Sequence, residues 1–329
     1  MTIMGAYLRD FHVTYDHCIG LLSIITNSLL LYLAIKKSDN YMKKYSIILV
    51  MSSVVDLFYN SMSIIFTPIV EIQQGSMFFF LGGVFEKLPH QPMGVIWMIF
   101  LFSIFATIIN IPMQFVYRYT ALCLNRQLTI TKYIALYLVI LPILAAHCVW
   151  GYYVFYPHED VIASHLPILK ADPVWSPNTP NFFVGDQHYF PAAMHFSVSF
   201  LIVAISYLIV IVVGLKIYLQ LRKVRFCMSK GTLEAQNQLT KILLIQAIIP
   251  FLSLSGPVMA VTAASLFSVE VPLLGYVMTY TAMWLPVVNS VSAILIIPNY
   301  RRSLFCRPSR KVLFSSTFFS ISRQNASTA

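Results

Sequence analysis

Charged residues are scarce in this sequence, and the short motifs of soluble enzymes are missing. Charged side chains make up 10% of its 329 residues, whereas a soluble domain carries about 25%. The chain contains no His-Glu-x-x-His pattern, no Gly-x-Ser-x-Gly elbow and no phosphate-cradling glycine loop. We therefore expect no soluble domain, no enzyme activity and no cofactor.

Cysteines are also few. The five cysteines lie far apart and form no Cys-x-x-Cys or similar spacing, so we expect neither a disulfide framework nor a metal site. The formal net charge of +10 would suit a nucleic-acid partner. The basic residues, however, lie beside hydrophobic segments, where they direct membrane orientation, so we expect no nucleic-acid partner.

The chain contains several long hydrophobic stretches with few charged residues. Hydrophobic residues make up 58% of the chain, and about 20 mostly apolar residues suffice to cross a bilayer as a helix. Seven stretches are long enough. They predict an all-α membrane protein whose seven transmembrane helices form a bundle in the lipid bilayer. They run, within a few residues, over 17–35, 45–69, 93–117, 134–155, 192–219, 241–267 and 273–297.

Lysine and arginine are distributed unevenly among the segments that connect these stretches. If the N-terminus is extracellular, 19 of the 22 basic residues fall on the cytoplasmic side. Positively charged connections stay in the cytoplasm during insertion. We therefore expect a multi-pass protein of the plasma membrane, with an extracellular N-terminus at residues 1–16, a bundle at 17–297 and a cytoplasmic tail at 298–329.

Two of the expected extracellular segments are unusual. Residues 157–187 form the longest connection and hold five prolines, so we expect a long outer loop with neither helix nor regular sheet. Residues 77–85 are apolar but too short to cross the bilayer. We expect them to form a loop at the membrane surface, and a re-entrant element is the alternative.

One acid, Asp56, falls near the middle of a predicted span. An ionisable group at that depth is costly and usually faces the bundle interior or water. We predict an internal polar site with Asn27, Asn289 or Ser290 as partners, because asparagine amides hydrogen-bond across helices. This site either differs between two functional states or is a protonated acid in a purely structural hydrogen bond.

Arg118 ends the third predicted span, between Tyr117 and Tyr119. In one interpretation this cation bonds to the inner ends of other helices in a resting state and releases them in an active one. In the other it is an interfacial anchor whose charged end extends toward the lipid headgroups. The sequence alone leaves both open.

Prolines interrupt several of the spans. Pro250 and Pro257 are seven residues apart in the sixth span, so they lie on nearly one face of that helix. Each removes a backbone donor and tends to kink its helix. A kink there would let the inner half of the sixth helix swing.

The start of the tail mixes basic and apolar residues. Residues 299–306 suit a short helix lying on the inner leaflet. Cys306 would be placed for palmitoylation on such a helix. A plain free thiol is the alternative.

With seven spans, Asn27, Asp56 and Arg118 in place, the chain resembles a serpentine G protein-coupled receptor. It is most similar to nematode chemoreceptors of the Str superfamily, and within that to the Srd family. The layout matches over nearly the whole chain, and the matching motifs are Ile-Pro-Met-Gln-Phe-Val-Tyr-Arg-Tyr at 111–119, Asn-Ser-Leu-Leu at 27–30 and Ile-Pro-Asn-Tyr-Arg at 297–301. The resemblance implies that Arg118 lies at the G protein face.

The sequence also departs from the larger rhodopsin-like pattern. Tyr117 stands before Arg118 where that pattern has an acid, and Ser290 follows Asn289 where it has a proline. No cysteine occurs at the outer end of the third span or in residues 157–187. The disulfide that usually ties those two parts is therefore missing, which leaves the outer lid less constrained.

The resemblance implies a chemosensory receptor of a sensory neuron cilium that binds a small-molecule or peptide ligand and activates a heterotrimeric G protein. The ligand would bind in the outer half of the bundle. A membrane transporter or ligand-gated channel is the alternative, although one mid-membrane acid makes no charge pathway. The expected signalling residues are Asn27, Asp56, Arg118 and Asn289, and the expected ligand-binding residues are Trp97, His147, Trp150, His195, Tyr280 and Trp284.

Overall fold

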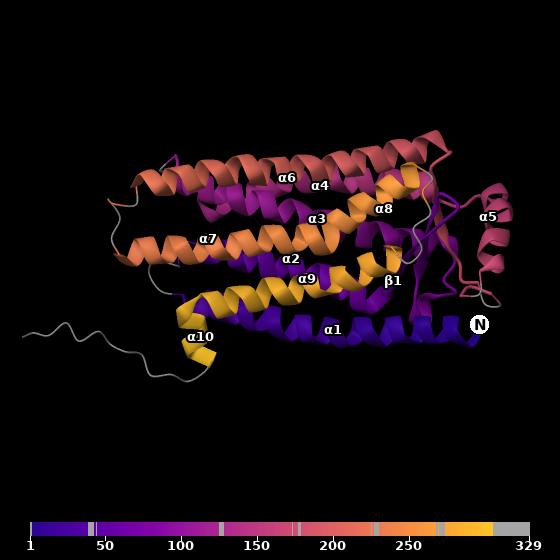
Figure 1. Cartoon of the computed structure of the whole chain (residues 1–329), viewed down its shortest axis with the longest axis horizontal. Helices are drawn as coiled ribbons and strands as arrows, with labels where there is room; N and C mark the ends of the chain where they lie inside the picture. The colour runs from indigo at the N-terminus through magenta and orange to yellow at the C-terminus, as the bar shows by residue number, and fades with distance from the viewer. Residues whose placement is uncertain are drawn as a thin grey trace, which may run out of the picture.

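A computed structural model describes residues 2–304 apart from 39–42, 44, 125–127, 173, 177–178, 225, 227–229, 268 and 270–273. Long helices lie side by side in it, and a small cap of strands and one short helix covers the end at which the N-terminus lies (Figure 1). The N-terminus and the last described helix lie at opposite ends of the bundle. Cys306, the predicted lipidation site, lies outside the described residues.

Seven helical segments are long and apolar enough to cross a membrane, as the sequence predicted. The first, α1, runs without a break from Thr2, so the expected N-terminal segment 1–16 continues into the first span. The fifth, α6, and the third, α3, are longer than a bilayer requires. The helices of the first five spans and the last are α1 (Thr2–Lys36), α2 (Ser46–Phe66), α3 (His90–Leu122), α4 (Ile130–Phe155), α6 (Phe190–Val224) and α9 (Leu274–Ile296).

The sixth span is interrupted, as the prolines predicted. It begins as α7 (Lys230–Pro250), passes through a π-helical turn, η3 (Phe251–Ser255), and continues as α8 (Gly256–Leu266). Pro250 offers no backbone N–H and its ring crowds the preceding turn, so the regular hydrogen-bond ladder is broken where the wider turn begins. The inner part of this span is therefore a separate straight helix joined to the rest at η3.

The cap contains an antiparallel three-stranded sheet with the order β1-β2-β3. A hairpin joins β1 (Pro68–Gln73) to β2 (Ser76–Leu81), and Gln74 and Gly75 both have positive φ in its two-residue turn. The third strand, β3 (Phe183–Asp186), pairs with β2, with Phe183 opposite Phe79. The expectation of a surface loop at 77–85 is therefore wrong: these residues form most of β2 and a short 3₁₀ turn, η1 (Gly83–Phe85).

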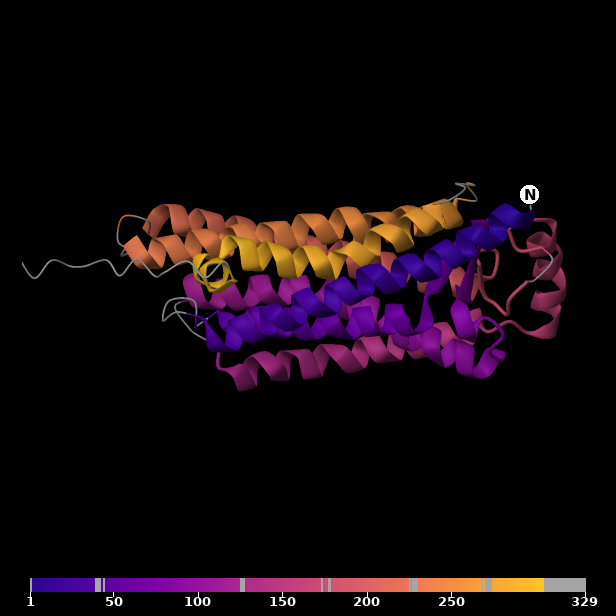
Figure 2. The ribbon, with the colours of Figure 1, turned by 90° about the horizontal axis from the view of Figure 1, so that it is seen from below.

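Residues 157–187 also differ from the expectation, because they contain a helix and a strand. The helix α5 (Glu159–Ala171) lies beyond the ends of the long helices, beside the sheet (Figures 1 and 2). Two acids in its first turn and Lys170 in its last favour it through the helix dipole, and Pro167 is accommodated within it. The prolines of this segment thus did not exclude regular structure.

The strand β2 is buried on both faces. Met77 and Phe79 belong to the cluster that fills the bundle, whereas Phe78 and Phe80 pack on the other side with Trp175, whose ring stacks on Phe80 at 4.0 Å. Side chains of a strand alternate between faces, so a strand buried on both has a continuous apolar run. The cap is thus two layers thick, and its inner face closes the end of the bundle.

At the opposite end, α9 is followed by α10 (Pro298–Leu304), which turns away from the bundle axis (Figure 1). The sequence predicted a short helix here. Tyr300 is fully buried, and its hydroxyl lies 2.6 Å from Ser38 Oγ at the end of α1. This contact attaches α10 to the bundle, and its position at the inner leaflet stays a prediction.

Candidate functional site

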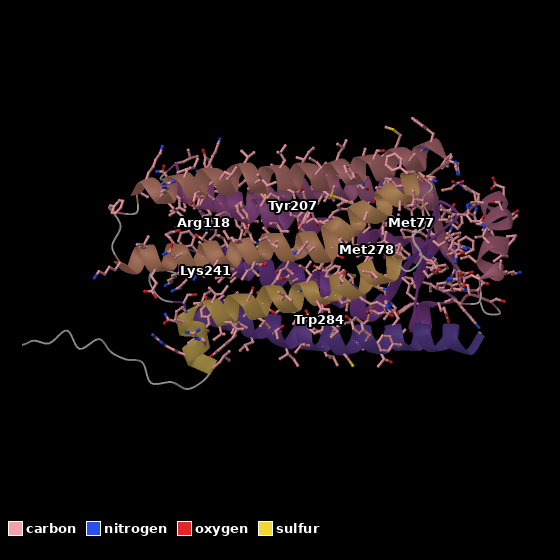
Figure 3. All side chains as sticks on the ribbon, viewed as in Figure 1. Met77, Arg118, Tyr207, Lys241, Met278 and Trp284 are labelled. Carbon is pink, nitrogen blue, oxygen red and sulfur yellow. The ribbon has the colours of Figure 1, made fainter. Side chains whose placement is uncertain are left out.

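A cavity lies inside the bundle, directly beneath the cap. It measures about 100 Å³ and is bounded by α3, α6, α8 and α9, with the sheet above it. Met77 from β2 and Met278 from α9 both line it, and Figure 3 shows them toward the cap end. Among the described residues, its lining holds no Asp, Glu, Lys or Arg and is largely aromatic and aliphatic. Such a cavity suits a small, uncharged, mainly apolar molecule.

A few polar groups lie on the cavity wall. Trp97 and His195 both line it, together with Ser199, Thr262 and Thr279. Trp97 Nε1 and His195 Nδ1 find no hydrogen-bond partner within the described part of the chain. A buried polar atom without a partner is costly. Because His195 Nε2 faces the backbone oxygen of His147, the Trp97 N–H can donate to a guest and His195 Nδ1 can accept from one. Of the six ligand-binding residues predicted, these two are the ones that line the cavity.

His147 and Trp150 lie behind the wall, against His195. The two imidazole rings stack with 4.1 Å between centroids and 8° between planes, and Trp150 lies 5.1 Å from the His195 ring. His147 Nε2 also lies 3.0 Å from Ser199 Oγ. These two residues therefore support the orientation of side chains that line the cavity without lining it themselves.

Tyr280 and Trp284 lie apart from the cavity, in the contact between α1 and α9. Trp284 Nε1 donates a 2.7 Å hydrogen bond to the hydroxyl of Tyr15, and that hydroxyl donates to the backbone oxygen of Tyr280 at 3.1 Å. The Trp284 side chain is 42% exposed, and Figure 3 shows it beside α1. The sequence could not separate these two from the others because the faces of the helices were unknown.

Asp56 and Asn289 meet in the middle of the bundle. Asn289 Nδ2 lies 3.3 and 3.2 Å from the two carboxylate oxygens of Asp56, and both residues are buried. Asn27 instead donates to the backbone oxygen of Pro286 at 3.0 Å. Ser290 donates to Thr26 at 2.8 Å. Of the three predicted partners, Asn289 contacts the acid, and the other two join α1 to α9.

Arg118 is buried between α3 and α7 at the end away from the cap. Its side chain is 1% exposed, which excludes the interfacial anchor. Nη2 donates to the backbone oxygen of Gln236 at 3.0 Å and to Thr240 Oγ1 at 2.5 Å. Gln236 in turn donates to the Tyr45 hydroxyl at 2.8 Å. We call this set, Arg118, Gln236, Thr240 and Tyr45, the inner latch.

The partners of Arg118 could not be identified from the sequence alone. Gln236 and Thr240 lie four residues apart on one face of α7, a spacing that any helix offers by chance. Thr240 Oγ1 also donates to the Gln236 backbone oxygen at 2.6 Å, so this oxygen accepts from both Arg118 and Thr240. A polar pair four residues apart at the inner end of a span was the one available signal.

A polar cluster holds the two layers of the cap together. Gln73 Nε2 donates to Glu71 at 2.8 Å and to Asp172 at 2.7 Å, and the indole N–H of Trp175 donates to the other Glu71 oxygen. Burial raises the pKa of Glu71 to about 7, and the nearby Asp172 charge adds to the rise, while the two donors oppose it. These bonds connect β1 to the segment after α5.

Seven spans with polar contacts buried between them define a serpentine seven-helix membrane bundle. A family model described as "Serpentine type 7TM GPCR chemoreceptor Srd" matches residues 12–306, which include the bundle, the cap and the inner latch. The chain belongs to this family of chemoreceptors, which confirms the resemblance. A search of curated proteins found no match.

Proposed function

We propose that this protein is a G protein-coupled chemosensory receptor whose ligand binds in the cavity beneath the cap. The single observation that supports this most is an apolar cavity with unpartnered polar atoms on Trp97 and His195. The inner latch lies at the other end of the same helix that carries Trp97. One continuous helix, α3, therefore connects the ligand cavity to the signalling end.

The cavity restricts the chemistry of the ligand. A volume near 100 Å³ corresponds to roughly seven to ten water-sized groups, which favours a small molecule over a peptide. A charged ligand would find no countercharge among the described lining residues, and burying a lone charge is costly. The Trp97 N–H favours a ligand with one hydrogen-bond acceptor, such as a carbonyl or ether oxygen.

The orientation follows from charge. The sequence segments that join the spans on one side, together with the tail, carry 19 of the 22 basic residues, which supports a cytoplasmic position for the end with the inner latch and an extracellular position for the cap. Signalling by such a receptor requires the plasma membrane, and the cilium of a sensory neuron is the site where a chemosensory ligand would reach it. A heterotrimeric G protein would meet Arg118 and the basic inner segments.

Activation would release the inner latch. The bonds from Arg118 hold α7 against α3 in the structure. A ligand that favours an arrangement with α7 apart from α3 shifts the population toward it in proportion to its preference for that state. The π-helical turn η3 lies between the cavity and α7, and its residue Leu254 lines the cavity. Movement at η3 would therefore couple the ligand to the latch.

The test is a screen in cells that carry a promiscuous G protein, with a panel of small uncharged compounds. We expect a few compounds to activate the wild-type receptor. Ala282→Phe fills the cavity, since Ala282 lines it and is 4% exposed, and should abolish the response at equal surface expression. Leu295→Phe on the same helix is the control, since Leu295 is 48% exposed. No response from the wild type, or an unchanged response from Ala282→Phe, would contradict the proposal. Transport of a compound into vesicles without G protein activation would instead favour a transporter.

A further inference from the structure

A second hollow lies on the outside of the bundle, between α3 and α4. Both helices are long and apolar enough to cross the membrane, so their exposed apolar side chains face lipid. Val95 and Val149 on its walls are 52% and 55% exposed. We call this hollow the α3–α4 groove; its walls include Val95, Ile99 and Phe102 from α3 and Ala145, Val149 and Tyr153 from α4.

The groove and the cavity share one side chain. Met98 lines both hollows, and it is the one described residue common to the two linings. Methionine is unbranched and has three rotatable bonds, so it changes shape more readily than a branched or aromatic side chain. The barrier between the lipid and the cavity at this point is therefore a flexible side chain, that of Met98.

Gly151 on α4 keeps this barrier thin, because it has no side chain to add to it. A Cβ atom at position 151 would lie 2.7 Å from His195 Nε2 and 3.4 Å from Met98 Sδ. The backbone of α4 thus approaches the two side chains directly, and residue 151 adds no side chain between the groove and the cavity. His195 lines the cavity and Met98 lines both, so the barrier at this place is one residue deep.

The sheet of the cap places two layers of side chains between the cavity and the aqueous side. Val70, Met77, Phe79 and Phe183 from the sheet cover the cavity. Behind them, Phe80 stacks on Trp175 at 4.0 Å in the second layer of the cap. A ligand entering through the cap would have to separate both layers, whereas one entering from the groove has to displace the Met98 side chain.

We propose that the α3–α4 groove is a lateral portal, through which an uncharged apolar ligand passes from the lipid bilayer into the cavity past Met98. This rests on the proposed function, because it takes the cavity as the ligand site. Such a ligand is concentrated in the bilayer, since each methylene group favours the apolar phase about fourfold. The membrane is then the reservoir from which the receptor samples its ligand.

The test measures access to the cavity with a thiol in place of a ligand. All five native cysteines are replaced by alanine, Cys148 in the groove included, and Thr262→Cys places one thiol on the cavity wall. The full chain in liposomes is then treated with methyl methanethiosulfonate, which is uncharged and enters lipid. The thiol attacks the reagent's sulfenyl sulfur, a disulfide forms and methanesulfinate leaves. A permanently charged trimethylammonium analogue, added on the cap side, reports access from water.

Tryptophan substitutions then fill the groove from its lipid side. Val149→Trp and, as a second variant, Ala145→Trp should each slow modification by the uncharged reagent about tenfold. Ile143→Trp is the matched control, because Ile143 is on the same helix, is 67% exposed and lies outside the groove lining, and it should leave the rate unchanged. The same thiol is compared in every variant, so its intrinsic reactivity cancels. The charged analogue should react far more slowly than the uncharged reagent.

Equal rates in Val149→Trp, Ala145→Trp and Ile143→Trp would overturn the portal, and so would modification by the charged analogue as fast as by the uncharged one. The labelling needs neither ligand nor G protein. A receptor that shows the groove effect but answers no compound therefore contradicts the proposed function and leaves the portal standing. A receptor that signals but shows no groove effect contradicts the portal alone.

Discussion

Arg118 on α3 and Thr240 on α7 are joined by a 2.5 Å hydrogen bond in the interior of the bundle. The bond is made by a charged donor at a site where the arginine is 1% exposed. Hydrogen bonds to charged groups contribute about 1.5–3 kcal/mol. This contact therefore holds α3 and α7 together at the end away from the cap.

Removing the Thr240 hydroxyl tests the latch while keeping Arg118. Thr240→Val preserves the shape of the side chain and removes the acceptor, whereas the bond from Arg118 to the Gln236 backbone stays. Because Arg118 keeps its bond to Gln236, we expect a net loss of about 1 kcal/mol, which raises ligand-independent G protein activation roughly three- to tenfold. Basal nucleotide exchange in membranes measures this. Asn237→Ala, an exposed neighbour on α7, is the control, and an equal rise there would argue against a specific latch.

Trp97 provides a test of ligand chemistry. Trp97→Phe keeps an aromatic ring in the cavity wall and removes the unpartnered N–H. Activating compounds with an oxygen acceptor should lose roughly 2- to 10-fold in potency, the effect of one neutral hydrogen bond. Their hydrocarbon analogues should not change. Dose–response curves for such pairs measure this, with Trp150→Phe behind the wall as the control; equal losses for both members of a pair would exclude a hydrogen bond from Trp97.

Asp56 should stabilise the bundle through Asn289. Asp56→Ala leaves the amide of Asn289 without its carboxylate, at a cost of about 1–3 kcal/mol. The unfolding temperature of the purified receptor should fall by roughly 3–10 °C. Asp56→Asn keeps an acceptor for Asn289, so its Tm should fall less. Val54→Ala is the control: Val54 lies on the same helix and is 48% exposed, so its replacement should change the Tm little. A Tm unchanged by Asp56→Ala would show that the pair adds nothing to stability.

The cap should lose stability as pH rises. Burial raises the pKa of Glu71 from 4.5 to about 7 in the folded state. A group whose folded pKa is raised binds its proton more tightly when folded, so its contribution is fully present below pH 4.5 and is lost as pH rises through 7. Asp172 is the other acid of this cluster and strengthens the effect while it is ionised.

Glu71→Gln should remove most of the difference in Tm between pH 5 and pH 8. The amide keeps an acceptor for the Trp175 indole and carries no charge. Thermal unfolding followed by tryptophan fluorescence measures the difference, because Trp175 lies in the cluster. Glu159→Gln, exposed at the start of α5, is the control. A pH dependence that survives Glu71→Gln would assign it to another group.

The number of spans could be predicted from the sequence, because length and apolarity define a span. Prolines marked several spans for a break, and the sixth is divided just after Pro250. Pro112, Pro142 and Pro286 instead lie inside continuous helices, so proline alone did not show which span would be divided.

A polar partner for Asp56 was also foreseeable, since an acid in the bilayer interior needs one. The sequence could not select Asn289 from the three candidates, and Asn27 and Ser290 bond elsewhere.

The cap could not be predicted, because its fold depends on contacts between segments that are far apart in the sequence rather than on local sequence. The apolar run of β2 has no alternation because Phe78 and Phe79 face different layers, one supplied by Trp175 and the other by the bundle. Its partner β3 lies about a hundred residues further along the chain. The faces of α9 were equally hidden, so Tyr280 and Trp284 were assigned to the ligand site although they pack against α1.

The most direct test of the account is ligand-dependent nucleotide exchange on a purified heterotrimeric G protein, with the receptor in nanodiscs and an activating compound from the screen. The account predicts exchange that rises with the compound in the wild type. It predicts no such rise in Arg118→Ala at equal folded receptor, because this variant lacks the side chain that meets the G protein as well as the latch. Exchange that is the same in both would remove Arg118 from signalling and contradict the connection from cavity to latch.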